Sequence, residues 1–234
     1  MLCIGKAFSA ENVNNYKYIS VYNKEYSIKT EEINKKLLKT DMYVMLGGSV
    51  LGAGILYLLP ESVTHWDKDD SSSIFKKWGR NVRKGPVQDD DDWFLNWVTH
   101  PYWGSVYYVA GRSAGLGILP SFGLSVFMST FFWEYGVEAF AEIPSKQDLI
   151  ITPVVGSLFG EALYVAKRRI IKNDHKVFNS SVLGHITTFL IDPITEVSEF
   201  FIKDRKDNNV NVMAFPTINS NGNFGYNVAV NIRF

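Results

Sequence analysis

Six ionisable side chains in the middle of the chain have types and spacings that could support acid–base chemistry. They are His100, Arg112, Glu134, Glu138, Asp148 and Glu161. Glu134 and Glu138 are four residues apart, so a helix would place them on one face. Arg112 and His100 are the natural partners of these two carboxylates. Carboxylates beside Arg and His in apolar surroundings have shifted pKa values, a common property of catalytic sites.

One chemistry for this set is hydrolysis or group transfer on lipid or glycan in a cell envelope. Either Glu134 or Glu138 would act as the general base, and His100 would act as an acid or a base. Arg112 would hold an anionic group of the substrate. The sequence therefore carries an enzyme hypothesis with named roles.

The alternative is that the same residues form a buried ion-pair network that locks one helix to another without catalysis. The sequence has no G-x-S-x-G, H-E-x-x-H or phosphate-loop motif, which favours this alternative. We leave enzyme activity open, and we expect no cofactor.

No pattern in the chain is typical of a metal site. Cys3 is the only cysteine, so a thiolate site is excluded. The acidic run Asp89–Asp92 lacks the alternating spacing and the glycine of a calcium loop. We expect a solvated loop surface at this run and no bound metal.

An uncharged run of 18 residues, Met42–Leu59, is closed by Pro60. Its length is at the threshold for a helix that crosses a hydrocarbon layer. Lys35, Lys36 and Lys39 precede it, which would place its start on the cytoplasmic side of an inner membrane. A buried core helix is the alternative.

Two further helices are predicted, over Phe122–Phe140 and Leu149–Ile171. We expect a turn or re-entrant bend near Leu119–Ser121 before the first, and Ser145 as the N-cap of the second with Asp148 in its first turn. The two helices would pack as a tight antiparallel hairpin. Glycine spacings that let helices approach closely occur at Gly48/Gly52, Gly111/Gly115 and Gly156/Gly160.

Composition indicates lipid rather than nucleic acid as a partner. Lys and Arg number 24 and so do Asp and Glu, so no global field attracts nucleic acid. Aromatic residues make up 15% of the chain and charged residues 21%, a shift toward proteins that meet lipid, and an aromatic-rich core of a soluble protein is the alternative. Lys167, Arg168, Arg169 and Lys172 would suit a helix C-terminus or anionic headgroups. We expect membrane lipid, and a partner protein of the envelope, as partners, and no nucleic acid.

Both ends of the chain show β patterns. Tyr16–Thr30 alternates aromatic or β-branched residues with polar ones, which predicts a short hairpin. Val210–Phe215 and a final strand predict another, with a turn at Asn221-Gly222. The terminal Phe234 resembles the carboxy-terminal signal of outer-membrane barrel strands, and an amphipathic edge strand is the alternative.

The expected fold class is mainly α, a membrane-embedded or membrane-associated helical bundle with a small antiparallel β element from the two termini. Residues 1–10 resemble a truncated signal peptide of an exported protein, and a cytoplasmic start is the alternative. In chain order we then expect an amino-terminal β hairpin and helix start at 11–40, an apolar helix at 41–60, a polar acidic loop at 61–92, a central helical domain at 93–200, and a linker with a carboxy-terminal β hairpin at 201–234.

A resemblance to a known family rests on several motifs in the central segment. They are H-P-x-x-G-x-x-Y at His100–Tyr107, A-G-R-S at Ala110–Ser113, W-E-Y at Trp133–Tyr135, Glu138, P-S-x-x-D-L at Pro144–Leu149, T-P-x-x-G at Thr152–Gly156 and G-E at Gly160–Glu161. In this order they resemble the uncharacterised bacterial family called domain of unknown function 3943, from about Trp93 to Ile171. The resemblance implies a Gram-negative cell envelope and no established activity. The outer membrane or the periplasmic face is the favoured location, with the inner membrane as the alternative.

Overall fold

The structure, a computed structural model, describes residues 22, 24–30, 32–61, 66, 73–88, 93–202, 210–218 and 224–232. This part of the chain is mainly helical, as predicted, and it divides into two compact units, Met1–Glu199 and Phe200–Phe234. The α-helices are α2 (Lys35–Leu58), α4 (Ile74–Lys84), α5 (His100–Ser113), α6 (Ile118–Val126), α7 (Asp148–Ile150), α8 (Gly156–Lys172), α9 (Ser181–Ile191) and α10 (Pro193–Ile202). Segments η3 (Leu95–Thr99), η4 (Phe127–Val137) and η6 (Ile151–Val155) are π-helical, and η5 (Glu138–Phe140) is a 3₁₀ turn.

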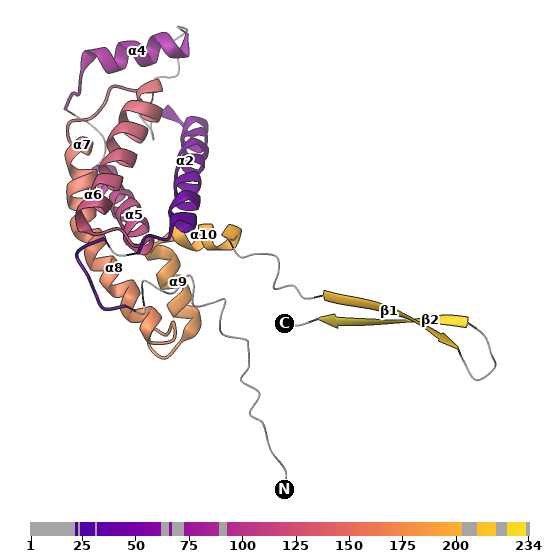
Figure 1. The fold of residues 1–234 in the computed structure, drawn as a ribbon. Coiled ribbons are helices and arrows are strands. Elements are labelled where there is room, and N and C mark those ends of the chain that lie inside the picture. The colour runs from indigo at the N-terminus through magenta and orange to yellow at the C-terminus, as the bar shows by residue number, and fades with distance from the viewer. Residues whose placement is uncertain are drawn as a thin grey trace. The chain divides into compact units, whose positions relative to one another are not determined.

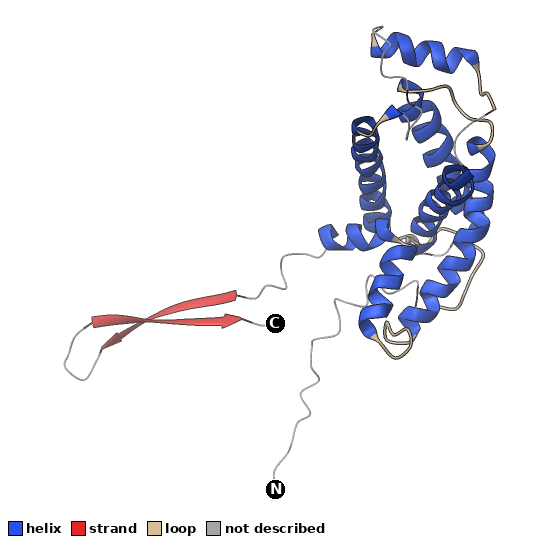
Figure 2. Ribbon diagram, turned by 180° about the vertical axis from the view of Figure 1, so that it is seen from behind, coloured by secondary structure: helices blue, strands red, loops and turns tan. Residues whose placement is uncertain are grey.

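The long helices of the first unit lie alongside one another (Figures 1 and 2). One end of the bundle, the Arg112 end, holds the Arg112–Glu161 ion pair. The other, the His100 end, holds the His100–Asp148 pair. Because each pair joins matching ends of α5 and the α7–α8 stretch, these two run in the same direction, whereas α2 and the α6–η4 stretch run in the opposite one.

The closest helix crossing lies between α5 and the η6–α8 stretch, and glycine makes it possible. A Cβ atom built on Gly104 would lie 1.8 Å from the Thr152 carbonyl oxygen, and one on Gly156 would lie 2.7 Å from the Gly104 Cα. Gly160 is in similar contact with Ser105. The Gly156/Gly160 spacing therefore hosts a close approach, but the partner is α5 rather than the 122–140 helix that the sequence predicted.

Gly104→Ala is expected to destabilise the protein by about 1–3 kcal/mol, because the two backbones must move apart. Thermal denaturation of the purified protein in detergent measures this loss. Gly52→Ala is the matched control, because a Cβ there meets nothing within 4 Å and alanine favours a helix by about 1 kcal/mol. Equal melting temperatures for Gly104→Ala and the wild type would contradict this crossing.

Helix α2 turns only a narrow stripe toward the bundle. Its buried residues recur every four positions and are Leu37, Asp41, Met45 and Ser49. Its exposed apolar residues are Tyr43, Val50, Leu51, Ile55, Tyr57 and Leu58. A Cβ on Gly48 or Gly52 meets nothing, so the close approach of another helix that this spacing predicted is not made by the described residues.

Two helical stretches are long and apolar enough to cross a membrane by length and composition, Lys35–Leu58 and Asp148–Lys172. Within the most apolar window of each, 17% of the first and 33% of the second are buried. The core helix of a water-soluble domain buries most of its apolar face. Both stretches instead leave most of theirs on the outside of the bundle.

Segment 61–92, predicted to be a polar loop, contains α4. Ile74, Phe75, Trp78 and Val82 recur at helical spacing, and Gly85 ends the helix with a φ of 71°. The loop prediction rested on the acidic run and the Gly-Pro pair that follow the helix, and it overlooked the helical spacing of these apolar residues. Figures 1 and 2 show α4 lying across the end of the bundle.

The predicted bend near Leu119–Ser121 is also wrong. Pro120 lies in the first turn of α6, where its missing N–H group breaks no helical hydrogen bond. The chain continues as one helical stretch from Ile118 to Phe140, with a π-helical part at η4. This stretch carries Glu134 and Glu138 to the His100 end.

In the second unit, strand β1 (Val210–Ile218) pairs antiparallel with β2 (Phe224–Ile232), with Ala214 opposite Val228. The predicted amino-terminal hairpin lies partly outside the described residues. Its described part, Tyr22 and Lys24–Thr30, contains no strand. The β element predicted from the two termini is therefore not found in the described part, where the two strands pair with each other.

Helix α5 contributes to both apolar clusters of the core. The first consists of Met45, Val106, Tyr107, Ala110, Met128 and Ile194. The second consists of Tyr22, Tyr108, Val109, Tyr164 and Ile191. In the described residues, the buried side chains that remain are largely polar or charged, including serines on α5, α6, η4 and α8.

Candidate functional site

Arg112, in the last turn of α5, forms a two-pronged ion pair with Glu161 of α8. The Arg112 Nε atom donates to Glu161 Oε2 at 2.9 Å, and Nη2 donates to Oε1 at 3.3 Å. Arg112 is only 2% exposed, and its guanidinium lies 4.5 Å from the centre of the Tyr164 ring. Such planar, two-pronged pairs fix geometry as well as charge.

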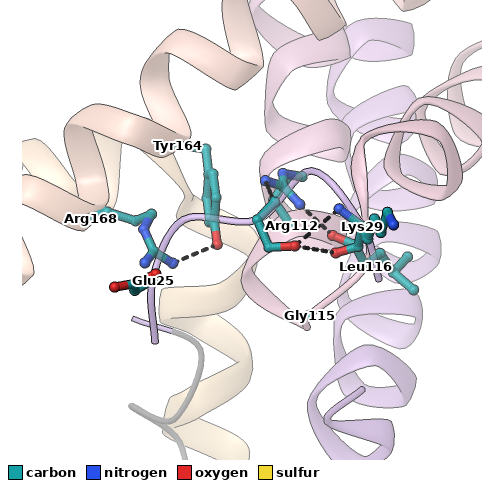
Figure 3. A pocket seen from close by; sticks show the side chains of 8 residues that line it. Glu25, Lys29, Arg112, Gly115, Leu116, Tyr164 and Arg168 are labelled. Atoms are coloured by element: carbon teal, nitrogen blue, oxygen red, sulfur yellow. Dashed lines mark hydrogen bonds between the residues drawn. The ribbon is translucent and has the colours of Figure 1, made fainter. Parts of the chain in front are cut away.

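The same guanidinium holds two loops against the Arg112 end (Figure 3). Its Nη1 atom donates to the Leu116 carbonyl oxygen and its Nη2 atom to the Ser27 carbonyl oxygen, both at 2.7 Å. Tyr26 and Tyr108 donate their hydroxyls to Glu161 at 2.8 and 2.6 Å. Burial and these bonds to a carboxylate raise the pKa of both tyrosines. The hydroxyls therefore stay protonated as donors.

Beside Arg112 lies a recess of about 10 Å³, lined by residues that include Lys29, Tyr164 and Arg168 (Figure 3). That volume suits roughly one water molecule. Arg168 donates to the Tyr164 hydroxyl at 3.1 Å and also to the Lys24 carbonyl oxygen. The recess has no room for a substrate, and the guanidinium groups of Arg112 and Arg168 are hydrogen-bonded to protein atoms.

At the His100 end, His100 Nδ1 lies 3.4 Å from Asp148 Oδ1 and 3.2 Å from Thr152 Oγ1. The Asp148 backbone is held by Ser145, whose hydroxyl accepts from Asp148 N at 3.1 Å and from Gln147 N at 3.1 Å. Ser145 thus caps the start of this helical stretch as predicted. Asp148 is positioned by Ser145, and its Oδ1 atom lies within ion-pair distance of the imidazole without a hydrogen bond to it.

Glu134 and Glu138 lie at the same end, and both are buried. Glu134 Oε1 accepts a hydrogen bond from Ser145 N. Burial, then the charge of Glu134 and that of Glu142, raises the pKa of Glu138 well above its ordinary value. The two carboxyl groups therefore act as a pair that keeps a proton at pH values where exposed carboxylates have lost theirs.

Glu138→Gln is expected to remove a pH dependence of stability. The folded-state pKa of Glu138 is raised, so the folded protein binds more protons than the unfolded chain above about pH 4.5. Stability therefore falls as pH rises through the folded pKa, by up to about 1.4 kcal/mol per pH unit. Melting temperatures in detergent from about pH 5 to about pH 9 measure this slope.

The glutamine variant keeps a hydrogen-bonding group without the charge, so its profile should be flatter than that of the wild type. Glu32→Gln is the control, because the Glu32 side chain is 86% exposed, and it should leave the slope unchanged. A wild-type melting temperature that does not fall with rising pH would show that ionisation of Glu138 does not destabilise the folded protein.

The structure divides the six predicted residues between the two ends of the bundle. Glu134, Glu138, His100 and Asp148 lie at one end and Arg112 and Glu161 at the other. Arg112 and His100 are twelve residues apart on α5, about 18 Å along its axis. The prediction that Arg112 pairs with Glu134 and Glu138 is therefore wrong, because Arg112 instead bonds Glu161 and two carbonyl oxygens.

A third buried cluster was missed. Lys167 of α8 lies 2.9 Å from Asp192 Oδ2, which also accepts from the Ser113 hydroxyl at 2.6 Å. Tyr22 in turn donates to Ser113 Oγ at 2.7 Å. Lys167 was predicted to suit a helix end or lipid headgroups, but it is 2% exposed and Asp192 is 0% exposed. The sequence feature that could have indicated this cluster is Asp192, an acidic residue directly before Pro193 at the boundary between two apolar helices.

Asp41 was also missed, because the apolar helix was predicted to begin after it. The residue lies inside α2, fully buried. Its carboxylate lies near the Ser198 side chain, but neither oxygen makes a hydrogen bond of ordinary geometry to the described residues. Within the same part of the chain, no three or more His, Cys, Asp or Glu side chains are grouped so that they could hold a metal ion.

Comparison with known proteins gives one match. Residues 85–194 match the model of a family described as Domain of unknown function (DUF3943). This range includes all six predicted residues as well as Lys167 and Asp192. No curated protein and no solved structure matches the chain.

Proposed function

We propose that the protein is a membrane-embedded helical module of the bacterial cell envelope. The premise is that residues 85–194 match the DUF3943 family. The protein binds lipid or a partner protein and is not a catalyst. One observation carries this proposal: in the described residues the bundle turns apolar side chains outward and buries polar ones.

The outward faces of the two long helical stretches support the membrane setting. On α2, Val50, Leu51 and Ile55 are each more than half exposed, and on α8 so are Leu158 and Phe159. Removing such a side chain from water is worth about 1.5–3 kcal/mol. Lipid satisfies these faces, whereas water would leave two apolar surfaces on one small domain.

The polar interior supports a structural role for the ionisable residues. Arg112 joins Glu161, and Lys167 joins Asp192, so these four charges are paired inside the bundle. Charged groups within a membrane protein normally face the interior and pair with one another. These pairs hold the helices in register.

The enzyme alternative, a hydrolase or transferase on lipid or glycan, needs an arginine beside the carboxylates and the histidine. Arg112 instead lies about 18 Å along α5 from His100, and the recess beside it is about 10 Å³. The His100 end retains His100, Glu134 and Glu138 without Arg112, although α4 brings other cations to that end. The separation of Arg112 from the other members of the predicted catalytic set favours the non-catalytic module.

Membrane fractionation of the tagged full-length protein, followed by a carbonate wash, tests the setting. We expect the protein in a membrane fraction after the wash, because two apolar faces hold it in lipid. Recovery with the outer membrane would agree with the favoured location, and recovery with the inner membrane would agree with the alternative. Release into the soluble fraction before or during the wash would contradict the proposal.

A further inference from the structure

The helix that the sequence prediction missed, α4, has two opposite surfaces. Ile74, Phe75, Trp78 and Val82 lie on one side, and its cations lie on the other. The cations are Lys76, Lys77, Arg80, Arg83 and Lys84, and Ile74–Lys84 contains no acidic residue. This combination of a strong apolar face and a basic face is typical of helices that lie in the plane of a membrane surface.

Part of the apolar side and the neighbouring Asn81 attach α4 to the bundle, and Lys77 is buried. Trp78 Nε1 donates to the Tyr135 carbonyl oxygen at 2.8 Å, and Asn81 Nδ2 donates to the Ala139 carbonyl oxygen at 3.1 Å. The Phe140 ring contacts Phe75 edge-on, with ring centres 5.8 Å apart. The helix is thereby fixed across the His100 end (Figures 1 and 2).

The surfaces left over remain open in the described part of the chain. Ile74 is 59% exposed and Phe75 is 72% exposed. Lys76, Arg83 and Lys84 are exposed as well. A lone apolar patch would fit any apolar partner, but a patch with a row of cations along the opposite side fits a layer that is apolar on one side and anionic on the other.

The position of α4 relative to α2 agrees with such a layer. With 24 residues, α2 is about 36 Å long, whereas the hydrocarbon core is about 30 Å thick. The end of α2 therefore reaches the headgroup level, and α4 crosses the bundle at that end. Trp93 and Trp97, which directly precede α5, are exposed at the same end, as expected of tryptophans at a membrane interface.

We propose that α4 is an interfacial anchor that binds anionic phospholipid headgroups with Lys76, Arg83 and Lys84, and inserts Ile74 and Phe75 beneath them. This inference rests on the proposed membrane setting and names the lipid class. Each cation near an anionic surface strengthens docking by about fivefold, and salt weakens it.

The test uses the full-length protein with Cys3→Ser and a single fluorophore on Phe75→Cys, reconstituted into vesicles. In vesicles of phosphatidylcholine mixed with phosphatidylglycerol, the fluorophore should be shielded from aqueous iodide. In phosphatidylcholine alone it should be much less shielded. A second protein labelled on Ile55→Cys of α2, which is 55% exposed, reports on the membrane setting itself.

Replacing three cations at once, with Lys76→Gln, Arg83→Gln and Lys84→Gln, should lower the docking constant on the order of a hundredfold. The matched control changes three exposed cations near the Arg112 end, with Arg169→Gln, Lys172→Gln and Lys176→Gln. It should leave the shielding at position 75 unchanged.

The other outcomes separate the two proposals. Shielding at position 55 without shielding at position 75 would overturn the anchor and leave the membrane setting intact, whereas shielding at neither would overturn the membrane setting. Equal shielding at position 75 in both lipids would overturn headgroup recognition. Shielding in detergent without lipid would mean that protein covers this face.

Discussion

Asp192→Ala is expected to be the most destabilising of the substitutions considered, with a loss of about 3–5 kcal/mol in the free energy of unfolding. The substitution removes the carboxylate that lies 2.9 Å from Lys167 Nζ and leaves that ammonium inside the bundle. Its remaining acidic neighbour, Glu196, is 3.6 Å away and more exposed. A buried charge without its partner costs far more than the pair contributes.

Two further bonds are lost with the same carboxylate. Ser113 Oγ loses its 2.6 Å acceptor, and Thr195 N loses its 3.1 Å bond to Asp192 Oδ1 at the start of α10. An N-cap of this kind is worth about 1 kcal/mol. Unfolding of the purified protein in detergent, followed by circular dichroism, measures the total.

Two variants separate the charge effect from the hydrogen bonds. Asp192→Asn keeps one acceptor oxygen, which can still take the bond from Thr195 N, so it should cost less than Asp192→Ala. Combining it with Lys167→Met removes both charges, and the double variant should be more stable than Asp192→Asn alone. A double variant that loses the sum of the two single losses would show that Lys167 and Asp192 are energetically independent.

Glu32→Ala serves as the control ion pair, because Lys24 and Glu32 lie 3.8 Å apart on the surface. Its expected cost is below about 1 kcal/mol.

Arg112→Ala is expected to cost about 3 kcal/mol, at the lower end for a broken buried ion pair. The carboxylate left behind, Glu161, is 21% exposed and keeps the hydroxyls of Tyr26 and Tyr108 as donors. The loss should nevertheless be large, because the Ser27 and Leu116 carbonyl oxygens lose their charged donor as well.

Limited proteolysis gives this variant a second readout. Arg112 donates a hydrogen bond to the Ser27 carbonyl oxygen, so proteolytic cleavage in segment 24–30 should be faster in Arg112→Ala. It should also be faster in Arg112→Lys, because lysine lacks the planar guanidinium group with its several donors. Arg169→Ala, which removes an exposed cation of α8, should change neither stability nor cleavage. A wild-type cleavage rate in Arg112→Ala would show that the loop is held by other contacts.

The features that sequence analysis predicted correctly are those set by local spacing. The apolar runs within α2 and α8 predict helices wherever they pack, and Ser145 is three residues before Asp148, the spacing of an N-cap. The Gly156/Gly160 spacing likewise indicates a close approach. None of these signals depends on which helix is the neighbour.

Partner choice could not be predicted, because it depends on how two helices cross. Gly104 and Gly156 bring α5 against α8 in parallel, and this register places Arg112 beside Glu161 rather than beside Glu134. Lys167 shows the same limit. A lysine after an apolar run has the same pattern whether it reaches headgroups or an internal acid such as Asp192, which lies 25 residues further along the chain.

The central claim, that apolar faces of the bundle contact lipid, is tested most directly by spin labels along α2. Single cysteines replace Ser49, Val50, Leu51 and Ile55 in the Cys3→Ser protein, reconstituted in vesicles. We predict high accessibility to oxygen and low accessibility to a water-soluble nickel reagent at Val50, Leu51 and Ile55, and low accessibility to both at the buried Ser49. High accessibility of the three outward positions to the nickel reagent would place this face in water, and low accessibility to both reagents would place it against protein. Either result would contradict the claim.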